Sequence, residues 1–131
     1  MFVPLSDVRR EEFDWGVIGW RLVPSKGADH LVVMDVELRP GGGHDFHRHP
    51  GQEEVIIVKE GRIVQYLDQE PRTLTAGDSV LVPEGVVHAS FNDDDEQTAF
   101  LQVVISPSLG GETGYGLEDV AEQEPWASLR G

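Results

Sequence analysis

The 131-residue sequence predicts an all-β fold in which short antiparallel strands pack as a sandwich or a barrel. Its apolar residues occur in short β-branched runs, such as VIIV at residues 55–58. Clusters of Gly, Pro, Asn and Asp separate these runs at intervals of about eight to twelve residues. No segment combines the length and the periodicity that a stable helix needs.

The first third of the chain is predicted to hold two strands after a short N-terminal turn at residues 6–12. Residues 15–23 (WGVIGWRLV) and 31–38 (LVVMDVEL) are strands, and the turn-rich PSKGAD lies between them. The second strand alternates apolar and charged residues toward its end, which is typical of a sheet with one buried face.

The later strands are shorter, and they are predicted at residues 62–67, 72–75, 80–82, 87–91 and 98–105. The acidic loop NDDDE at 92–96 resembles a cation site, but a solvated turn is the favoured interpretation. Beyond residue 107 the composition becomes glycine-rich and then acidic. We expect this tail, 108–131, to contain one helical turn near 117–122 and to pack onto something through its aromatic residues Tyr115 and Trp126.

Composition limits the classes of partner and compartment. The length fits a single domain, 1–131. The net charge of −14 would repel phosphate backbones and anionic lipid, so we expect no nucleic-acid partner. No apolar run approaches the roughly 18 residues of a membrane span, and we expect a cytoplasmic protein. There is no cysteine, so any metal must be held by nitrogen and oxygen.

Residues 41–61, GGGHDFHRHPGQEEVIIVKEG, predict a metal-binding β-hairpin. In an extended strand His47 and His49 lie on the same face, with Cβ atoms roughly 6.5–7 Å apart. Two imidazoles at that separation can converge on one ion with bonds of about 2.1 Å. The turn residues Pro50, Gly51 and Gln52 then bring a carboxylate back to the histidines.

A second stretch, GDSVLVPEGVVHASFN at 77–92, has the same pattern of a strand, a Pro-x-Gly turn and a histidine, His88. If the two predicted hairpins face each other, His88 completes a set of three imidazoles and one carboxylate.

These two stretches resemble the motifs of small single-domain cupins, G-x5-H-x-H-x(3,4)-E-x6-G and G-x5-P-x-G-x2-H-x3-N. All ten fixed positions are present: Gly41, His47, His49, Glu54, Gly61, Gly77, Pro83, Gly85, His88 and Asn92. The resemblance implies a double-stranded β-helix, or jelly-roll barrel, with a core at about residues 15–107 and both motifs within 41–92.

The resemblance also implies that His47, His49, Glu54 and His88 bind a divalent transition metal. Iron, manganese, nickel, copper and zinc all accept imidazole and carboxylate, so the sequence does not choose among them. A barrel that binds no metal is the alternative. The family spacing permits Glu53 in place of Glu54, but strand parity places Glu54 with Ile56 and Val58, which favours Glu54.

Other polar residues near the motifs have open roles. Asp45 has the parity of the histidines, so it either bonds a ligand imidazole or faces water at the mouth. His44 and His30 are interpreted as surface residues. Gln52, Gln65 and Gln102 lie near or within apolar strands, where they are candidates to line a pocket.

The resemblance points to a quercetin-dioxygenase-like enzyme that binds an enol, phenol or diketone together with dioxygen. A metal-dependent isomerase or lyase and a non-catalytic binding protein are the alternatives. An isomerase would need a separate acid or base, and the sequence offers only Glu53 and Asp45, which tilts the prediction toward oxygen chemistry. The partner is therefore a small molecule. We also expect a homodimer, because one small barrel is not expected to cover both the apolar residues 17–20 and the aromatic tail residues Tyr115 and Trp126.

Overall fold

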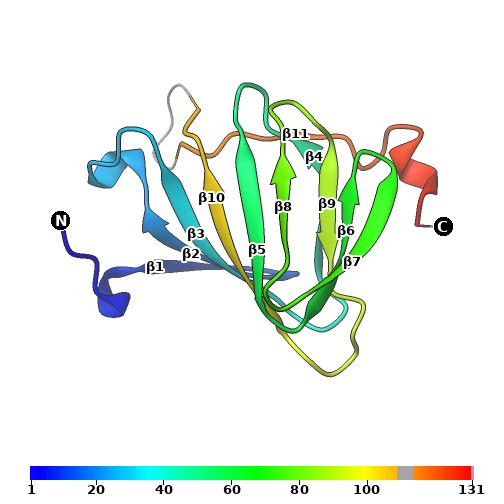
Figure 1. Ribbon diagram of the computed structural model, residues 1–131, viewed down its shortest axis with the longest axis horizontal. Helices are drawn as coiled ribbons and strands as arrows, with labels where there is room; N and C mark the ends of the chain where they lie inside the picture. The colour runs from blue at the N-terminus through cyan, green and yellow to red at the C-terminus, as the bar shows by residue number, and fades with distance from the viewer. Residues whose placement is uncertain (109–113, 131) are drawn as a thin grey trace.

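The computed structural model describes residues 1–108 and 114–130, and these form two antiparallel β-sheets that face each other (Figure 1). The six-stranded sheet consists, in spatial order, of β1 (Arg9–Phe13), β2 (Gly16–Leu22), β3 (Val32–Leu38), β10 (Ala99–Ile105), β5 (Glu54–Glu60) and β8 (Ser79–Val82). The five-stranded sheet consists of β11 (Glu118–Asp119), β4 (Gly43–Arg48), β9 (His88–Phe91), β6 (Arg62–Leu67) and β7 (Glu70–Thr75). Three short 3-10 turns, Leu5–Asp7, Pro24–Lys26 and Trp126–Ser128, complete the described structure.

The core between the sheets follows from the alternation of the sequence. In β3, β5 and β10 every second side chain is buried, as the period of a strand requires. Leu101 of β10 is paired with Val36 of β3 on one side and with Val58 of β5 on the other, and all three are buried. Rows of this kind form a continuous apolar layer, to which Ile63 and Leu74 of the five-stranded sheet also contribute.

The C-terminal tail covers the outer face of the five-stranded sheet. Phe46, Tyr66 and Ala89 form a second apolar cluster there, and Val120 and Trp126 of the tail pack against it. Trp126 also donates a hydrogen bond from Nε1 to Asp68 (3.3 Å). The tail therefore packs onto its own barrel, and in Figure 1 it runs past β4 to end at the opposite side of the molecule from the N-terminus.

The prediction of two hairpins is wrong in one respect, because the two strands of each predicted hairpin lie in different sheets. β4 pairs with β9 and β11, whereas β5 pairs with β10 and β8. The turn at residues 49–53 therefore carries the chain from one sheet to the other. The same holds for β8 and β9, whose connection crosses between the sheets. The carboxylate thus reaches the histidines from the opposite sheet rather than from a paired strand.

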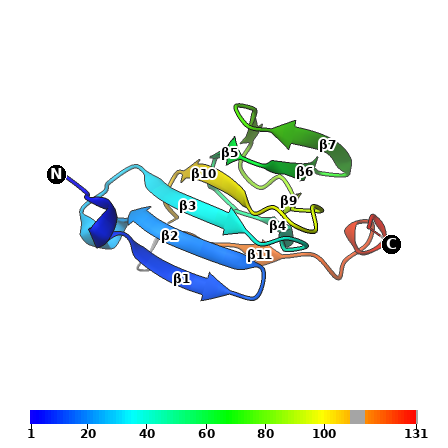
Figure 2. The same cartoon turned by 90° about the horizontal axis from the view of Figure 1, so that it is seen from below.

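Two short strands were not predicted. Residues 6–12 were expected to form only a turn, but the 3-10 turn at Leu5–Asp7 leads into β1. The sequence RREEF of β1 has no apolar alternation, because it is an edge strand that pairs only with β2 (Figure 2). The predicted helical turn near 117–122 is instead the two-residue strand β11 followed by a turn.

The N-terminal side chains that suggested a homodimer are covered by their own chain, whereas Tyr115 and Trp126 of the tail are half-buried. Val17, Ile18 and Trp20 are buried, and Trp20 donates a hydrogen bond from Nε1 to Glu11 (3.0 Å). They therefore no longer argue for a second copy. Among the described residues no helix is both long and apolar enough to cross a membrane.

Candidate metal centre

The four predicted ligands meet in the interior of the barrel. His47 lies on β4 directly opposite His88 on β9, His49 follows the end of β4, and Glu54 begins β5. All four residues are buried, with an exposed fraction of at most 3% each. The backbone reaches this arrangement through a tight entry to β4: Gly41 has a φ of +75°, and a Cβ at Gly42 would lie 2.3 Å from the carbonyl oxygen of Trp15.

One ligand atom from each histidine lies within 4.8 Å of the other two. Glu54 Oε1 is 2.9 Å from His88 Nε2, and Glu54 Oε2 is 3.5 Å from His49 Nε2. These separations are close to what one ion with bonds of about 2.1 Å requires of its ligands. Glu53, the alternative, is exposed and lies outside the cluster.

The hydrogen bonds of the other ring nitrogens determine what the cluster can bind. His47 Nδ1 donates to the carbonyl of Asp45 (2.6 Å), His88 Nδ1 donates to that of Val86 (3.0 Å), and His49 Nδ1 donates to that of Gly116. Since a carbonyl only accepts, each Nδ1 carries the proton, and each Nε2 of a neutral ring offers a lone pair.

In this arrangement the hydrogen-bond acceptors of the histidines, their Nε2 atoms, face another acceptor, the carboxylate of Glu54. The buried Nε2 atoms of His49 and His88 have no hydrogen-bond donor, and the neighbouring group is the carboxylate of Glu54. Lone pairs that converge in a buried site are stable only if a cation or a proton lies between them. The donor set, three imidazoles and one carboxylate, therefore fits a divalent transition metal.

Burial favours the neutral form of His47 and His49. The pKa of His47 is lowered well below its ordinary value, first by burial and then by the neighbouring histidines. Burial also lowers the pKa of His49, although the charge of Glu54 opposes this. Neutral imidazoles are the form that coordinates metal, so these two rings need not lose a proton before they bind it.

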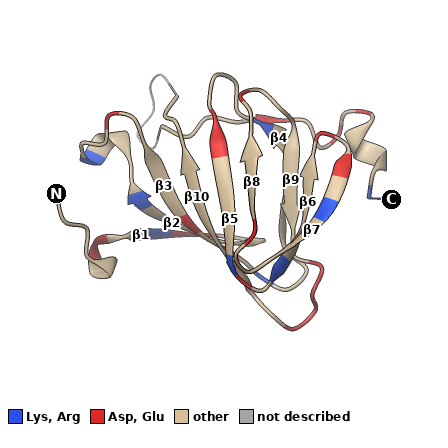
Figure 3. Cartoon of the chain, viewed as in Figure 1, with Lys and Arg blue, Asp and Glu red and all other residues tan. Residues whose placement is uncertain are grey.

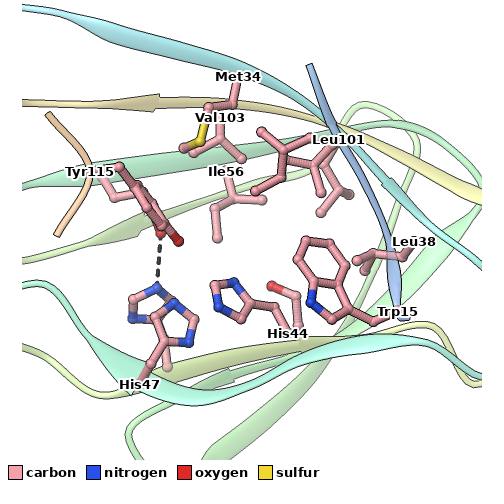
Figure 4. A pocket seen from close by; sticks show the side chains of 14 residues that line it. Trp15, Met34, Leu38, His44, His47, Ile56, Leu101, Val103 and Tyr115 are labelled. Carbon is pink, nitrogen blue, oxygen red and sulfur yellow. Dashed lines mark ion pairs between the residues drawn. The ribbon is translucent and has the colours of Figure 1, made fainter. Parts of the chain in front are cut away.

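His44 is a site residue that the sequence interpretation placed on the surface. The register of β4 against β9 is irregular between His44 and His47, and this irregularity turns the side chain of His44 inward and that of Asp45 outward. Figure 4 shows His44 between His47 and Trp15. Its ring stacks on both, with centroid distances of 3.8 and 5.3 Å. Burial lowers its pKa to about 4, so the ring is neutral at pH 7.

Of the two roles left open for Asp45, the structure agrees with a residue that faces water. Its side chain is exposed and accepts only the backbone N–H of Phe46, whereas its backbone carbonyl holds His47. The carboxylate of Asp45 therefore does not bond a ligand imidazole, and the peptide carbonyl of the same residue does so instead.

A small apolar cavity adjoins the ligands. Aliphatic side chains of the six-stranded sheet form most of its wall, and Trp15, His44, Ser90 and Tyr115 add aromatic and polar atoms (Figure 4). Its volume is about 30 Å³, far below the roughly 300–1,000 Å³ of pockets that enclose drug-sized ligands. Phe91 of β9 does not line this cavity but packs against the second cluster on the outer face of its sheet.

The polar glutamines are divided between three environments. Gln52 bonds the tail, Gln65 accepts a hydrogen bond from Ser90, and Gln102 bonds Asp35 on the outer face of the six-stranded sheet. None of the three lines the cavity beside the histidines. His30 is exposed, as expected.

Comparison with known proteins identifies the family. The sequence model described as "Cupin domain" matches residues 34–104, which is more than half of the chain. The chain belongs to the cupin family. The predicted fold class is confirmed, since the two sheets of this cupin form a double-stranded β-helix. The polyketide cyclase RemF from Streptomyces resistomycificus superposes with a TM-score of 0.74 at 24% identity, over 98% of this chain and 97% of that one.

Two curated relatives match part of the cupin. The protein YdbB of Bacillus subtilis is 44% identical over 61 residues, which is 46% of this chain and 51% of YdbB. The auxin-binding protein ABP19b of Prunus persica is 36% identical over 85 residues, 61% of this chain and 41% of the relative. The chain thus spans about half the length of the curated relatives it matches. The shared regions support the domain and leave the activity of the whole protein to be proposed.

Proposed function

We propose that this cupin is a metal-dependent enzyme whose small substrate binds through an oxygen atom to an ion held by His47, His49, His88 and Glu54. The most direct support is that the buried Nε2 atoms of His49 and His88 have no hydrogen-bond donor and face the carboxylate of Glu54. When bound, the ion would act as a Lewis acid that polarises the substrate oxygen. Iron, manganese, nickel, copper and zinc all remain candidates.

The apolar wall supports a substrate with few polar groups. Ile56, Leu101 and Val103 face the ligands across the cavity, so they would exclude water from the reacting atoms (Figure 4). His44 and Tyr115 are the polar side chains best placed to contact a substrate that touches the ligand set. A compact enol, phenol or diketone matches this combination of apolar wall and sparse hydrogen-bonding groups.

His44 favours non-oxidative chemistry, as in an isomerase or lyase, over dioxygenation. The dioxygenase prediction depended partly on the lack of an acid or base near the ligands. The neutral ring of His44 supplies such a group, because it lines the cavity and is not one of the clustered ligands. That RemF is a polyketide cyclase is in keeping with this preference.

The deciding experiment compares product formation from enols, phenols and diketones under air and under argon, with the iron- or manganese-loaded protein. We expect equal rates. A requirement for dioxygen would instead establish the dioxygenase prediction. His44→Phe keeps a ring between Trp15 and His47 but removes its nitrogens, so the rate under argon should fall about 10²- to 10⁴-fold while metal content is unchanged. Binding of these compounds without turnover would support a binding protein.

We also propose that two copies associate through the outer face of the six-stranded sheet. Val33, Val104, Val55 and Leu81 form a row there across β3, β10, β5 and β8. β8 and β10 carry no charged residue (tan in Figure 3), so this face would bring two chains of charge −14 together with least repulsion. Light scattering at micromolar concentration should give a dimer mass, and Leu81→Glu should give a monomer. A monomeric wild-type protein would contradict the proposal.

A further inference from the structure

Gln52 has a buried side chain that the metal centre does not use directly. It lies in the crossing turn between His49 and Glu54 and is 1% exposed. Its Nε2 donates to the carbonyls of Ser106 (2.7 Å) and Gly114 (2.8 Å), and its Oε1 accepts from the backbone N–H of Gly116 (3.0 Å). Only an amide can donate and accept in this way, because a carboxylate has no donor and an apolar side chain has neither.

The backbone that Gln52 holds is in direct contact with the metal centre. The carbonyl of Gly116 accepts the Nδ1 proton of His49, and the ring of Tyr115 lies 4.7 Å from that of His49. Farther along, β11 pairs with β4 so that Asp119 is opposite His47. Arg48 and Glu118 form an ion pair across the same two strands (2.7 Å).

We propose that residues 114–119 form a strap that completes the metal centre, and that Gln52 is a positioning residue which fixes His49 through this strap. The inference deepens the proposed function, because it concerns how the same ligand set is held. A ligand imidazole is oriented by the acceptor of its other ring nitrogen. For His49 that acceptor belongs to a segment 67 residues away in sequence, which Gln52 joins to the turn beside the ligand.

The strap also borders the cavity. Tyr115 contributes to the cavity wall and packs edge-on against Trp20 at a centroid distance of 5.9 Å. The strap therefore carries both the acceptor of His49 and part of the cavity wall, and Gln52 holds it through two hydrogen bonds, to Gly114 and Gly116.

The test uses zinc as the probe and two substitutions that add the same charge. Gln52→Glu keeps the shape of the side chain but removes the donor to Ser106 and Gly114. Gln69→Glu makes the same change at an exposed turn. Competition with a chromogenic chelator should show about 10- to 100-fold weaker zinc binding by Gln52→Glu and no change for Gln69→Glu. Gln52→Met, which buries no charge, should weaken binding similarly.

Nuclear magnetic resonance separates this proposal from the metal site itself. In metal-free wild-type protein the Nδ1 proton of His49 should give a slowly exchanging signal, and this signal should be lost in both Gln52 variants. If the wild-type protein binds no zinc, the proposed function fails, but the His49 signal still decides the role of Gln52. Folded variants with an unchanged signal and wild-type zinc affinity would overturn the proposal.

A measurement on the wild-type protein covers the case in which neither Gln52 variant folds. If the strap orients a ligand, zinc binding must in return stabilise the strap. Hydrogen exchange at the amide of Gly116 should then slow at least tenfold on addition of zinc, whereas the exposed amide of Gln69 should be unaffected. An unchanged exchange rate at Gly116 in zinc-saturated protein would overturn the proposal.

Discussion

A single residue, His88, connects the two sheets, because its ring projects from β9 and contacts Glu54 of β5. We predict that His88→Ala loses the ion after dialysis against a chelator and does not rebind it at micromolar concentration. The barrel should remain folded by circular dichroism, because the apolar core lies mostly elsewhere. His30→Ala, at an exposed histidine, is the control. Full metal occupancy in the His88 variant would contradict the assignment.

The two adjacent glutamates provide a matched pair for a second prediction. Glu54 is buried beside two Nε2 atoms, whereas Glu53 is exposed. Glu54→Gln should weaken metal binding by more than about 100-fold, beyond the usual effect of a group outside the ligand shell. Glu53→Gln removes the same charge and should change affinity less than about threefold. A larger loss at Glu53, measured by isothermal titration, would reverse the choice between them.

The residue scale also shows a limit of prediction from sequence. Strand parity correctly groups Glu54 with Ile56 and Val58 on the inner face of β5, because that strand is regular. The same argument fails for β4, where the irregularity between His44 and His47 exchanges the inward and outward positions. A bulge of this kind depends on how the partner strand is paired, which a single sequence does not reveal.

At the scale of elements, the positions of most strands could be predicted and their partners could not. Residues 62–67 and the longer apolar runs are strands within a residue or two of the expected ends, since the pattern of turns and β-branched residues is local. Two strands joined by Pro50, Gly51 and Gln52 resemble a hairpin, but they lie in different sheets. The choice depends on which other strands are free to pair, and this is a property of the whole fold.

The side chain of Asp94 stabilises the acidic loop between β9 and β10 in a turn conformation. Its carboxylate accepts the backbone N–H groups of Gln97 (2.9 Å) and Glu96 (2.8 Å), and these bonds lower its pKa below the ordinary 3.8. A lowered pKa stabilises the fold above pH 3.8, and this contribution is lost as the pH falls through the folded-state pKa.

We therefore predict that Asp94→Asn lowers the Tm at pH 7, and that the difference from wild type shrinks as the pH is lowered below 3.8. Asp95→Asn removes the same charge from an exposed neighbour and is the control. Differential scanning calorimetry between pH 7 and pH 3 gives the comparison. A difference that grows toward low pH, or an equal effect in Asp95→Asn, would contradict this role.

At the scale of the whole molecule, the metal centre depends on segments that are remote in sequence. The cupin motifs within residues 41–92 supply the four proposed ligands, but the carbonyl that accepts from His49 comes from Gly116, and the wall of the cavity includes Trp15 and Tyr115. Neither Gly116 nor Trp15 belongs to a motif. The aromatic character of the tail was the only sequence signal, and it predicts packing without saying against which surface.

The ligands themselves are divided between the sheets, which leads to the last prediction. His47 and His88 belong to the five-stranded sheet and Glu54 to the six-stranded one, so a bound ion would join the two layers of the barrel in the native state only. At a metal concentration 100 times the Kd, such binding stabilises the folded protein by about 2.7 kcal/mol. For a domain of this size each kcal/mol corresponds to roughly 3–6 °C.

We therefore expect zinc or manganese to raise the Tm of the metal-free protein by roughly 8–16 °C at that concentration. The increase should vanish in His88→Ala and persist in Glu53→Gln, whose carboxylate lies outside the cluster. Differential scanning fluorimetry with a series of metal concentrations measures it directly. A wild-type Tm that does not change at 100 times a Kd measured independently would mean that the ion binds folded and unfolded chains alike, and this would contradict a site built from both sheets.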